Sequence, residues 1–361
     1  MKNVIIIYGG RSPEHDISVI TACLARGYFD GNLYSVYFNK QNECYLVPND
    51  FTPVRHVTEK LKNKVVFLFG ESAIGVIKGK RIVKKIPVDV VVNCCHGSNG
   101  EDGTVAALCN LLGAPVVGSP LIPSAVAMDK VVTKYVLSQM GLPVVKGFSL
   151  RQNDVNDFAV LKADLAYPLI VKPSTLGSSI GVKVVNNDDE LEQALIAAFK
   201  YDGKVLCEQA LTDYAELNCA AMRVKGEVIT SNVDCPQSIH DILTFEDKYV
   251  QNSAVSGGGQ VSDDVKRQVG NLTERIYSEL GFQGVIRVDY LYDKTTDTLY
   301  VNEINTIPGS LAYGLWEQRY TRTEYGQALV EQAVNDKRLS SRRLSVFDSG
   351  VLNGVNGIKK K

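Results

Sequence analysis

Residues 284–309 read GVIRVDYLYDKTTDTLYVNEINTIPG and predict two β-strands joined by a turn. The segments 285–292 and 298–304 are rich in β-branched and aromatic residues, as strands are. The polar run between them, 293–297, is typical of a turn. We therefore expect a β-hairpin whose two strands are neighbours in one sheet.

Four polar side chains of this hairpin are expected to converge. Because alternate residues of a strand share a face, Arg287 points the same way as Asp289. Glu303 and Asn305 share a face of the second strand in the same manner. Two carboxylates and an amide oxygen are ligands that Mg²⁺ takes, and Arg287 would hold a phosphate or a developing oxyanion. By itself the hairpin also fits a surface ion-pair ladder.

The composition limits the class of protein. A chain of 361 residues, 45% apolar and 22% charged, suits a globular protein of two or three domains. Lys plus Arg number 39 against 40 acidic residues, so neither nucleic acid nor a membrane surface is an expected partner. No signal peptide or apolar span of about 18 residues is apparent. The eight cysteines lack CxxC spacing, which fits thiols in a reducing compartment, so we expect a cytoplasmic protein.

The chain opens with the pattern of a ligand-binding α/β unit. An apolar run at 4–8 leads into GGRSPEH at 9–15 and an amphipathic stretch at 16–29. Amides at a helix start favour an anion, which Glu14 would repel, so Glu14 suits a substrate ammonium better. A carboxylate that merely favours the helix N-terminus remains the alternative.

A second strand ends in a similar way. The mostly apolar run 88–95 leads into HGSNGEDG at 96–103 and then a helix. Open α/β sheets bind ligands beyond the carboxyl ends of their strands. We therefore assign His96 to a site rather than to the core.

A phosphate-binding loop is predicted after residue 173. The strand 167–173 ends in Lys172 and a proline, and the loop STLGSSIG follows at 174–181. Such a loop exposes amides and hydroxyls to phosphate oxygens, and Lys172 supplies the charge. The lysine precedes the glycines, so this is not a Walker A loop. The arrangement suits a flap that folds over a nucleotide.

Periodicity predicts several further elements. Helices are expected at 123–140, which carries MDK at 128–130, and at 188–201, 262–280 and 324–334. Strands are expected at 205–211 and 214–222, and the long polar segment 234–259 is expected to be a functional lid.

Together these motifs resemble the D-alanine–D-alanine ligase family of the ATP-grasp superfamily. The resemblance covers roughly residues 3–320 and rests on GGRSPEH, HGSNGEDG, MDK, VKPSTLGSSIGV, FEDKY, RVD and NEINTIPG, in the family's order. It implies an α/β and α+β fold in which an N-terminal Rossmann-like (pre-ATP-grasp) domain precedes a two-domain ATP-grasp fold. The implied parts are a substrate domain at 1–121, a central ATP-grasp domain at 122–213, a C-terminal ATP-grasp domain at 214–340 and a polar tail at 341–361.

The resemblance further implies how ATP and Mg²⁺ are held. Asp289, Glu303 and Asn305 match ligands of two Mg²⁺ ions, for which Mn²⁺ is a possible substitute, with Glu303 bridging. The residues implied for ATP are Lys130, Lys172 and Ser179 near the phosphates, Glu208, Ala210 and Leu211 at the adenine, Glu216 at the ribose and Lys248 at the γ-phosphate.

The amino-acid residues follow from the same resemblance. Arg287 and the amide of Gly309 match oxyanion stabilisers. The remaining implied residues are Glu14, Ser178 and Tyr249 as a hydrogen-bonded set with Glu14 on the first ammonium, His96 and Glu101 in the first subsite, and Ser310 and Leu315 in the second. The implied activity is ATP-dependent joining of two D-alanines through an acylphosphate, for peptidoglycan precursors, by a homodimer.

One departure from the family pattern concerns the second substrate. Gly314 stands where the family usually has a serine that helps hold the second carboxylate, which leaves D-serine or another D-amino acid open. Tyr249 is typical of relatives that accept an amine. Another dipeptide-forming ATP-grasp ligase, or a non-catalytic ATP-binding regulator, would be the other interpretations.

Overall fold

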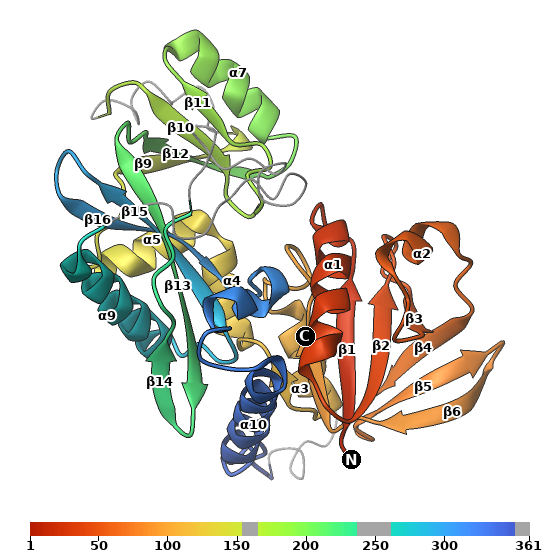
Figure 1. The fold of residues 1–361 in the computed structure, drawn as a ribbon. Coiled ribbons are helices and arrows are strands. Elements are labelled where there is room, and N and C mark those ends of the chain that lie inside the picture. Colours follow the sequence, from red (N-terminus) through yellow and green to blue (C-terminus); the bar gives the residue numbers. More distant parts are fainter. Residues whose placement is uncertain (154–164, 237–260, 351–361) are drawn as a thin grey trace.

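The computed structural model describes residues 1–153, 165–236 and 261–350, and Figure 1 shows three sheets. The strands of the first sheet are β1 (Asn3–Gly9), β2 (Asn32–Phe38), β3 (Cys44–Val47), β4 (Asn63–Leu68), β5 (Ala73–Lys78), β6 (Arg81–Pro87), β7 (Val90–Asn93) and β8 (Val116–Val117). Their order is β6-β5-β4-β3-β2-β1-β7-β8. Strands β2, β1, β7 and β8 are parallel to one another. Strands β3 to β6 extend the sheet from β2 as an antiparallel meander.

The other two sheets are antiparallel and lie at the upper centre and the left of Figure 1. One contains β9 (Gly147–Arg151), β10 (Leu169–Pro173), β11 (Lys183–Val185) and β12 (Lys204–Gln209) in the order β11-β10-β12-β9. The other contains β13 (Tyr214–Val224), β14 (Glu227–Thr230), β15 (Ile286–Asp293) and β16 (Thr298–Asn305) in the order β14-β13-β15-β16. The predicted fold class, an α/β unit followed by α+β units, is confirmed.

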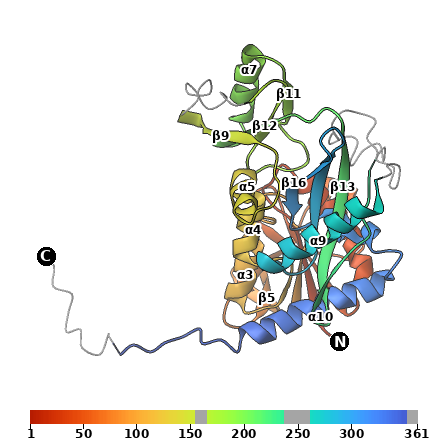
Figure 2. The same ribbon diagram turned by 90° about the vertical axis from the view of Figure 1, so that its left-hand side faces the viewer.

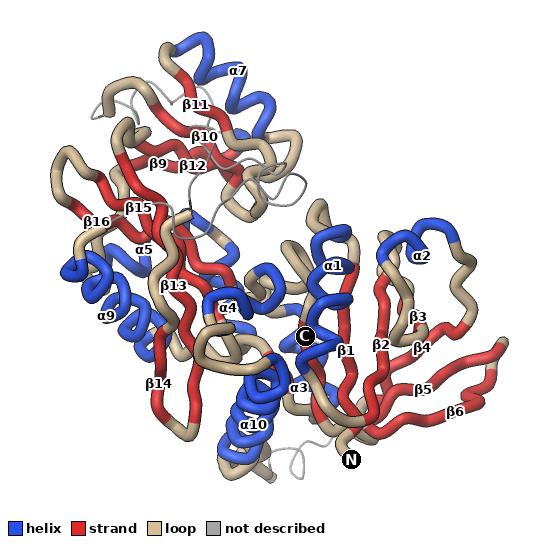
Figure 3. Tube along the Cα trace, viewed as in Figure 1, coloured by secondary structure: helices blue, strands red, loops and turns tan. Residues whose placement is uncertain are grey.

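Helices cover these sheets, as the tube in Figure 3 shows. The helical elements are α1 (His15–Ala25), η1 (Arg26–Tyr28), α2 (Pro53–Thr58), α3 (Thr104–Leu112), α4 (Leu121–Met128), α5 (Lys130–Gln139), α7 (Asp188–Ala198), α9 (Asp263–Glu279), η3 (Gly309–Leu315) and α10 (Arg322–Ser340). None of the described helices is long and apolar enough to cross a membrane.

Two helix predictions need correction. The expected helix 123–140 is broken at Asp129, whose extended backbone separates α4 from α5. The Asp129 carboxylate accepts from the amides of Val131 and Val132, so it caps α5 and places Lys130 in the first turn. The last helix begins before residue 324, because Thr321 and Glu324 form a capping box, and it ends at Ser340.

One hydrophobic core joins the first sheet to the C-terminal part of the chain. Helix α10 packs against β7 and β8 and also against β13, and Figure 2 shows it running along the base of the molecule. The core combines Val92 and Tyr8 of the first sheet with Met222 of β13 and Leu329 of α10. Val285 and Ile307, which flank the two strands of the β15–β16 hairpin, belong to the same core.

Candidate active site

The β15–β16 hairpin brings its four polar side chains together, which confirms the predicted convergence. Arg287 pairs with Asn305, and Asp289 pairs with Glu303. Arg287 donates from Nε to Asp289 Oδ1 at 2.6 Å and from Nη2 to Oδ2 at 2.7 Å. Asn305 Nδ2 donates to the same Oδ2 at 3.0 Å. These residues line two cavities rather than an open surface ladder.

A β-bulge turns one more side chain toward the site. The hairpin register shifts after the pair Asp289–Glu303 and skips Asn302, so two consecutive residues of β16 oppose one residue of β15. Both Asn302 and Glu303 line the same cavity. Asn302 Oδ1 accepts from Lys172 Nζ at 3.2 Å. Strict strand alternation does not predict Asn302 as a site residue.

Two neighbouring cavities are lined by both antiparallel sheets. They share Lys172 and Tyr214, and their volumes are about 100 Å³ and about 340 Å³. The smaller is lined by Lys130, Lys172, Ser179, Glu216, Asp289 and Glu303, and the larger by Lys172, Glu208, Ala210 and Leu211. Every residue that the resemblance implied for ATP thus lines one of them, except Lys248, which lies outside the described residues. The lysines Lys130 and Lys172 in the lining suit a nucleotide with its phosphates beside the hairpin.

A buried charge cluster supports the larger cavity. The Glu208 carboxylate, 2% exposed, contacts Lys134 and lies 2.7 Å from Lys172 Nζ. Burial raises the pKa of Glu208, but the two lysines outweigh it and hold that pKa below its ordinary value. Burial lowers the pKa of Lys134, and Glu208 opposes that shift. Glu208 is therefore a carboxylate held by two cations.

Lys134 is absent from the residues that the sequence singled out. It lies four residues after Lys130 on α5, so both project from one face of the helix. This four-residue spacing from Lys130, which the resemblance implies for the ATP phosphates, is a usable sequence signal for Lys134.

A third cavity, of about 380 Å³, lies where the first sheet meets the hairpin. Strands β1 and β7 are parallel neighbours, so the segments that follow them reach the same sheet edge. The predicted residues lining this cavity are Glu14, His96, Glu101, Ser178, Arg287, Glu303, Asn305, Gly309 and Ser310. Glu303 lines this cavity and the smaller of the two cavities that share Lys172, so it lies between them.

Ser178 connects the glycine/serine loop to the first sheet. Its hydroxyl donates to Glu14 Oε1, which confirms that these two predicted residues meet. The Glu14 side chain makes no capping hydrogen bond to helix α1 and lines the cavity instead. The arrangement favours the ammonium interpretation of Glu14 over a purely helix-stabilising one. Tyr249, the third member of the implied set, lies outside the described residues.

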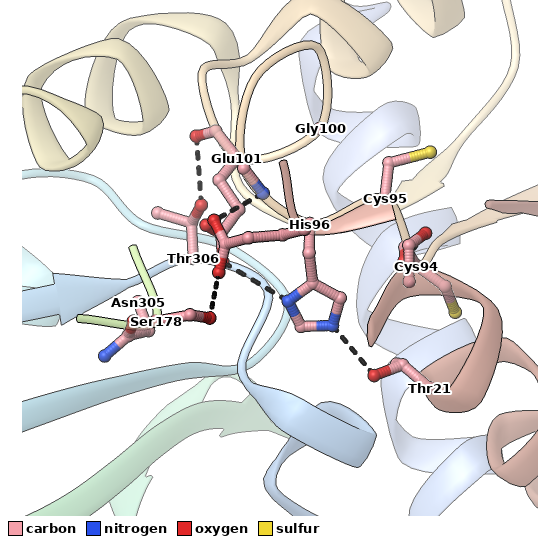
Figure 4. A network of polar contacts seen from close by, with 12 residues as sticks. Thr21, Cys94, Cys95, His96, Gly100, Glu101, Ser178, Asn305 and Thr306 are labelled. Atoms are coloured by element: carbon pink, nitrogen blue, oxygen red, sulfur yellow. Dashed lines mark hydrogen bonds and ion pairs between the residues drawn. The ribbon is translucent and has the colours of Figure 1, made fainter. Parts of the chain in front are cut away.

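Figure 4 shows a polar network around His96. Thr21 Oγ1 lies 2.8 Å from His96 Nε2, and Glu101 Oε1 lies 3.8 Å from His96 Nδ1. Thr306, the residue after Asn305, donates to the Glu101 carbonyl at 3.1 Å and so links the network to the end of strand β16. Burial, with a contribution from Arg287, lowers the pKa of His96 to about 3. Burial, reinforced by the charge of Glu14, raises the pKa of Glu101 to about 8.

Glu101 predicts a pH dependence of stability. Its pKa in the folded protein exceeds the ordinary value of about 4.5, so the folded state binds this proton more tightly than the unfolded chain. The stabilising contribution is complete below about pH 4.5 and is lost as the pH rises toward 8. In urea titrations between about pH 5 and 8, the free energy of unfolding should fall less with rising pH in Glu101→Gln than in the parent protein. Equal slopes would contradict a protonated Glu101.

Element η3, directly after the hairpin, has a strained backbone. Ser310, Leu311 and Ala312 have φ angles of 51°, 53° and 56°. A left-handed conformation costs a non-glycine residue roughly 1–2 kcal/mol. Tyr325 OH donates to the Leu311 carbonyl at 2.5 Å, and the Ser310 amide donates to Thr21 Oγ1 at 3.3 Å. Contacts from two other helices thus hold this turn.

The implied second subsite is only partly reproduced. Gly309 and Ser310 line the 380 Å³ cavity, whereas Leu315 is not among its lining residues and packs against the hydrophobic core. A Cβ built on Gly314 meets no described atom within 4 Å, so a side chain would fit there.

The fold and the arrangement of the three cavities fit an ATP-grasp enzyme, with Lys130 and Lys172 at one cavity and Glu14 and His96 at another. Comparison with known proteins is more specific. The family description "D-ala D-ala ligase N-terminus" matches residues 3–119, and "D-ala D-ala ligase C-terminus" matches residues 136–332. The D-alanine–D-alanine ligase of Thermosipho africanus is 36% identical over 330 residues, covering 88% of this chain and 89% of its own. The chain belongs to the D-alanine–D-alanine ligase family.

Two solved structures are similar over nearly the whole chain. The D-alanine–D-alanine ligase of Coxiella burnetii is 25% identical with a TM-score of 0.80, covering 94% of this chain and 96% of its own. The VanG D-Ala:D-Ser ligase of Enterococcus faecalis is 25% identical with a TM-score of 0.78, covering 92% and 98%.

Proposed function

We propose that the protein joins D-alanine to D-alanine with ATP, forming D-alanyl-D-alanine for peptidoglycan precursors. The observation that carries this proposal is the position of the β15–β16 hairpin. We assign the 380 Å³ cavity to the amino acids (the amino-acid cavity) and the 100 Å³ and 340 Å³ cavities to ATP (the smaller and larger nucleotide cavities). Glu303 lines both the amino-acid cavity and the smaller nucleotide cavity, so a carboxylate in one can meet a phosphate in the other. Family membership and the described ATP-site residues support the same activity.

In the first step the carboxylate of one D-alanine attacks the γ-phosphate of ATP, giving an acylphosphate and ADP. Glu14, beside Ser178, would hold the ammonium of this amino acid. Lys130 and Lys172 would neutralise the phosphates, since phosphoryl transfer depends mainly on positioning and charge.

In the second step the free amine of the other D-alanine attacks the acyl carbon, and phosphate leaves. The tetrahedral intermediate carries an oxyanion, which Arg287 and the Gly309 amide would stabilise from the cavity wall. The assignment of the lid residues Lys248 and Tyr249 to the γ-phosphate and to the hydrogen-bonded set remains part of this proposal on the sequence resemblance alone.

The hairpin suits two Mg²⁺ ions, or Mn²⁺ in their place. Among the described residues no three His, Cys, Asp or Glu side chains form a metal site. The implied set differs, because it has the carboxylates of Asp289 and Glu303 and the amide oxygen of Asn305, all hard oxygen donors. In the described structure Arg287 and Lys130 balance the two carboxylates. Bound Mg²⁺ would neutralise the phosphate charge during transfer.

The substrate assignment is tested by phosphate release with ATP, Mg²⁺ and single or paired amino acids, with products identified by mass. We expect turnover with D-alanine and D-Ala–D-Ala as the main product. Preference for D-Ala–D-Ser would indicate that residues 310–316 set a different specificity for the second substrate. The absence of turnover with any D-amino acid would overturn the ligase proposal.

Gly314 provides a sharper variant of the same assay. The family resemblance places a serine at position 314, and a Cβ built there meets no described atom within 4 Å, so Gly314→Ser should add a hydrogen bond to the second carboxylate. We expect KM for the second amino acid to fall about tenfold, the value of one such charge-assisted bond. Gly314→Ala, which adds only the methyl group, is the matched control. Equal effects of both variants would show that the carboxylate of the second substrate does not contact position 314.

Two finer assignments, a homodimer and the division at about residues 121, 213 and 340, rest on the family resemblance. A third, a cytoplasmic location, rests on the cysteine pattern of the sequence. All eight cysteines are free thiols, in keeping with a reducing compartment. Sedimentation of the purified protein tests the dimer, and a single species of monomer mass across the concentration range would contradict it.

A further inference from the structure

We propose that Thr21 is a positioning residue that couples the two amino-acid subsites through one hydroxyl group. It lies on helix α1, is 1% exposed and lines the amino-acid cavity. The inference rests on the proposed ligase function, because it assigns the two subsites as described above. Neither the motifs nor the implied residue roles include Thr21.

The first contact of this hydroxyl is with the first subsite. Thr21 Oγ1 lies 2.8 Å from Nε2 of His96, whose other ring nitrogen faces Glu101 (Figure 4). The imidazole is 3% exposed, so water does not replace a lost partner easily. Thr21 therefore fixes the ring orientation of His96 in the wall of the cavity.

The second contact is with the turn that presents the oxyanion donor. The Ser310 amide donates to Thr21 Oγ1 at 3.3 Å, one residue after Gly309. Ser310 is the first of the three consecutive left-handed residues in η3. Such a turn persists only where surrounding groups hold it. Displacement of Ser310 would move the adjoining Gly309 peptide away from the reacting carbon.

One hydroxyl can serve both partners because it has one proton and two lone pairs. It can accept from the Ser310 amide while it shares a hydrogen bond with His96. Valine has nearly the same shape and fills the same space, but it cannot form a hydrogen bond with either Ser310 or His96. Serine keeps the hydroxyl and loses only the methyl group.

The kinetic test compares Thr21→Val with Thr21→Ser. For Thr21→Val we expect kcat/KM for D-alanine to fall about tenfold or more, the loss of a buried hydrogen bond, with KM for ATP unchanged. Thr21→Ser should restore most of the activity. Equal activity of Thr21→Val and the parent protein, a parallel rise of KM for ATP, or no rescue by serine would each overturn the proposal.

The matched control is Ser35→Ala, which removes another buried hydroxyl with two partners. Ser35 accepts from Arg26 Nε at 3.1 Å and donates to Asn49 Oδ1 at 2.9 Å, and it lines none of the three cavities described above. We expect Ser35→Ala to lower stability without changing kcat/KM. An equal kinetic loss in this control would mean that Thr21 acts only through stability.

A second readout does not depend on turnover. In protein with ¹⁵N-labelled histidine, the ring signals of His96, assigned with His96→Gln, should shift in Thr21→Val and return in Thr21→Ser. Unchanged His96 signals in Thr21→Val would contradict the hydrogen bond between Thr21 and His96. If the parent protein shows no amino-acid-dependent turnover while these signals shift as expected, the proposed function fails and the Thr21 contact stands.

Discussion

Replacing Arg287 with methionine is expected to lower kcat about 10²- to 10³-fold, the usual cost of removing one preorganised oxyanion donor. Arg287 lines the amino-acid cavity and makes a two-pronged ion pair with Asp289, which sets the direction of its guanidinium. Methionine retains much of the aliphatic bulk but neither charge nor N–H groups. Steady-state phosphate release with ATP and D-alanine measures the effect, and KM for ATP should change little.

Two controls separate this catalytic role from simple loss of charge or stability. Arg287→Lys keeps the cation but loses the planar fork, so its kcat should lie between those of the parent and Arg287→Met. Arg275→Met removes an exposed ion pair to Glu279 on α9, at 2.7 Å, and should leave kcat unchanged. A kcat of Arg287→Met close to that of the parent protein would show that Arg287 does not stabilise the oxyanion.

Glu208→Gln is expected to lower the free energy of unfolding by about 3–5 kcal/mol, the typical cost of breaking a buried ion pair by removing one partner. The carboxylate is 2% exposed and contacts both Lys134 and Lys172. A neutral amide leaves two buried ammonium groups without their counter-charge. Urea titration near pH 7 measures the loss, and ATP binding should weaken in the same variant because Glu208 lines the larger nucleotide cavity.

A double-mutant cycle with Lys134→Met tests whether the cluster acts as a unit. If Lys134 compensates Glu208, the double variant should lose less stability than the sum of the two single variants. Glu71→Gln is the matched surface change, since its pair with Lys85 at 2.7 Å is about half exposed, and it should cost at most about 1 kcal/mol. Equal losses in Glu208→Gln and Glu71→Gln would contradict a buried, compensated carboxylate.

Local patterns were sufficient to predict the hairpin and its four converging side chains. Alternation in a strand has a period of two, so sequence spacing alone assigns Arg287 and Asp289 to one face. The glycine segments that follow β1 and β7 were similarly informative, because parallel neighbours end at one sheet edge. Glu14 and His96 could be assigned to a site for that reason.

Other site residues depend on contacts between distant segments. Lys134 and Thr21 look like ordinary helix residues, and their burial is set by how α5 packs on β12 and how α1 packs on η3. Asn302 enters the site through a bulge, which strict alternation does not predict. The break at Asp129 was missed because the helical pattern continues across it.

Charged and glycine residues at set spacings indicate the class of chemistry, since they specify which groups lie at the ends of strands. Which of these groups share a cavity, and which further side chains support them, depends on the tertiary fold. Spacing fixes short-range geometry, whereas burial and hydrogen-bond partners depend on segments far apart in the chain. Thr21 and Ser310, separated by 289 positions, meet through one hydroxyl group.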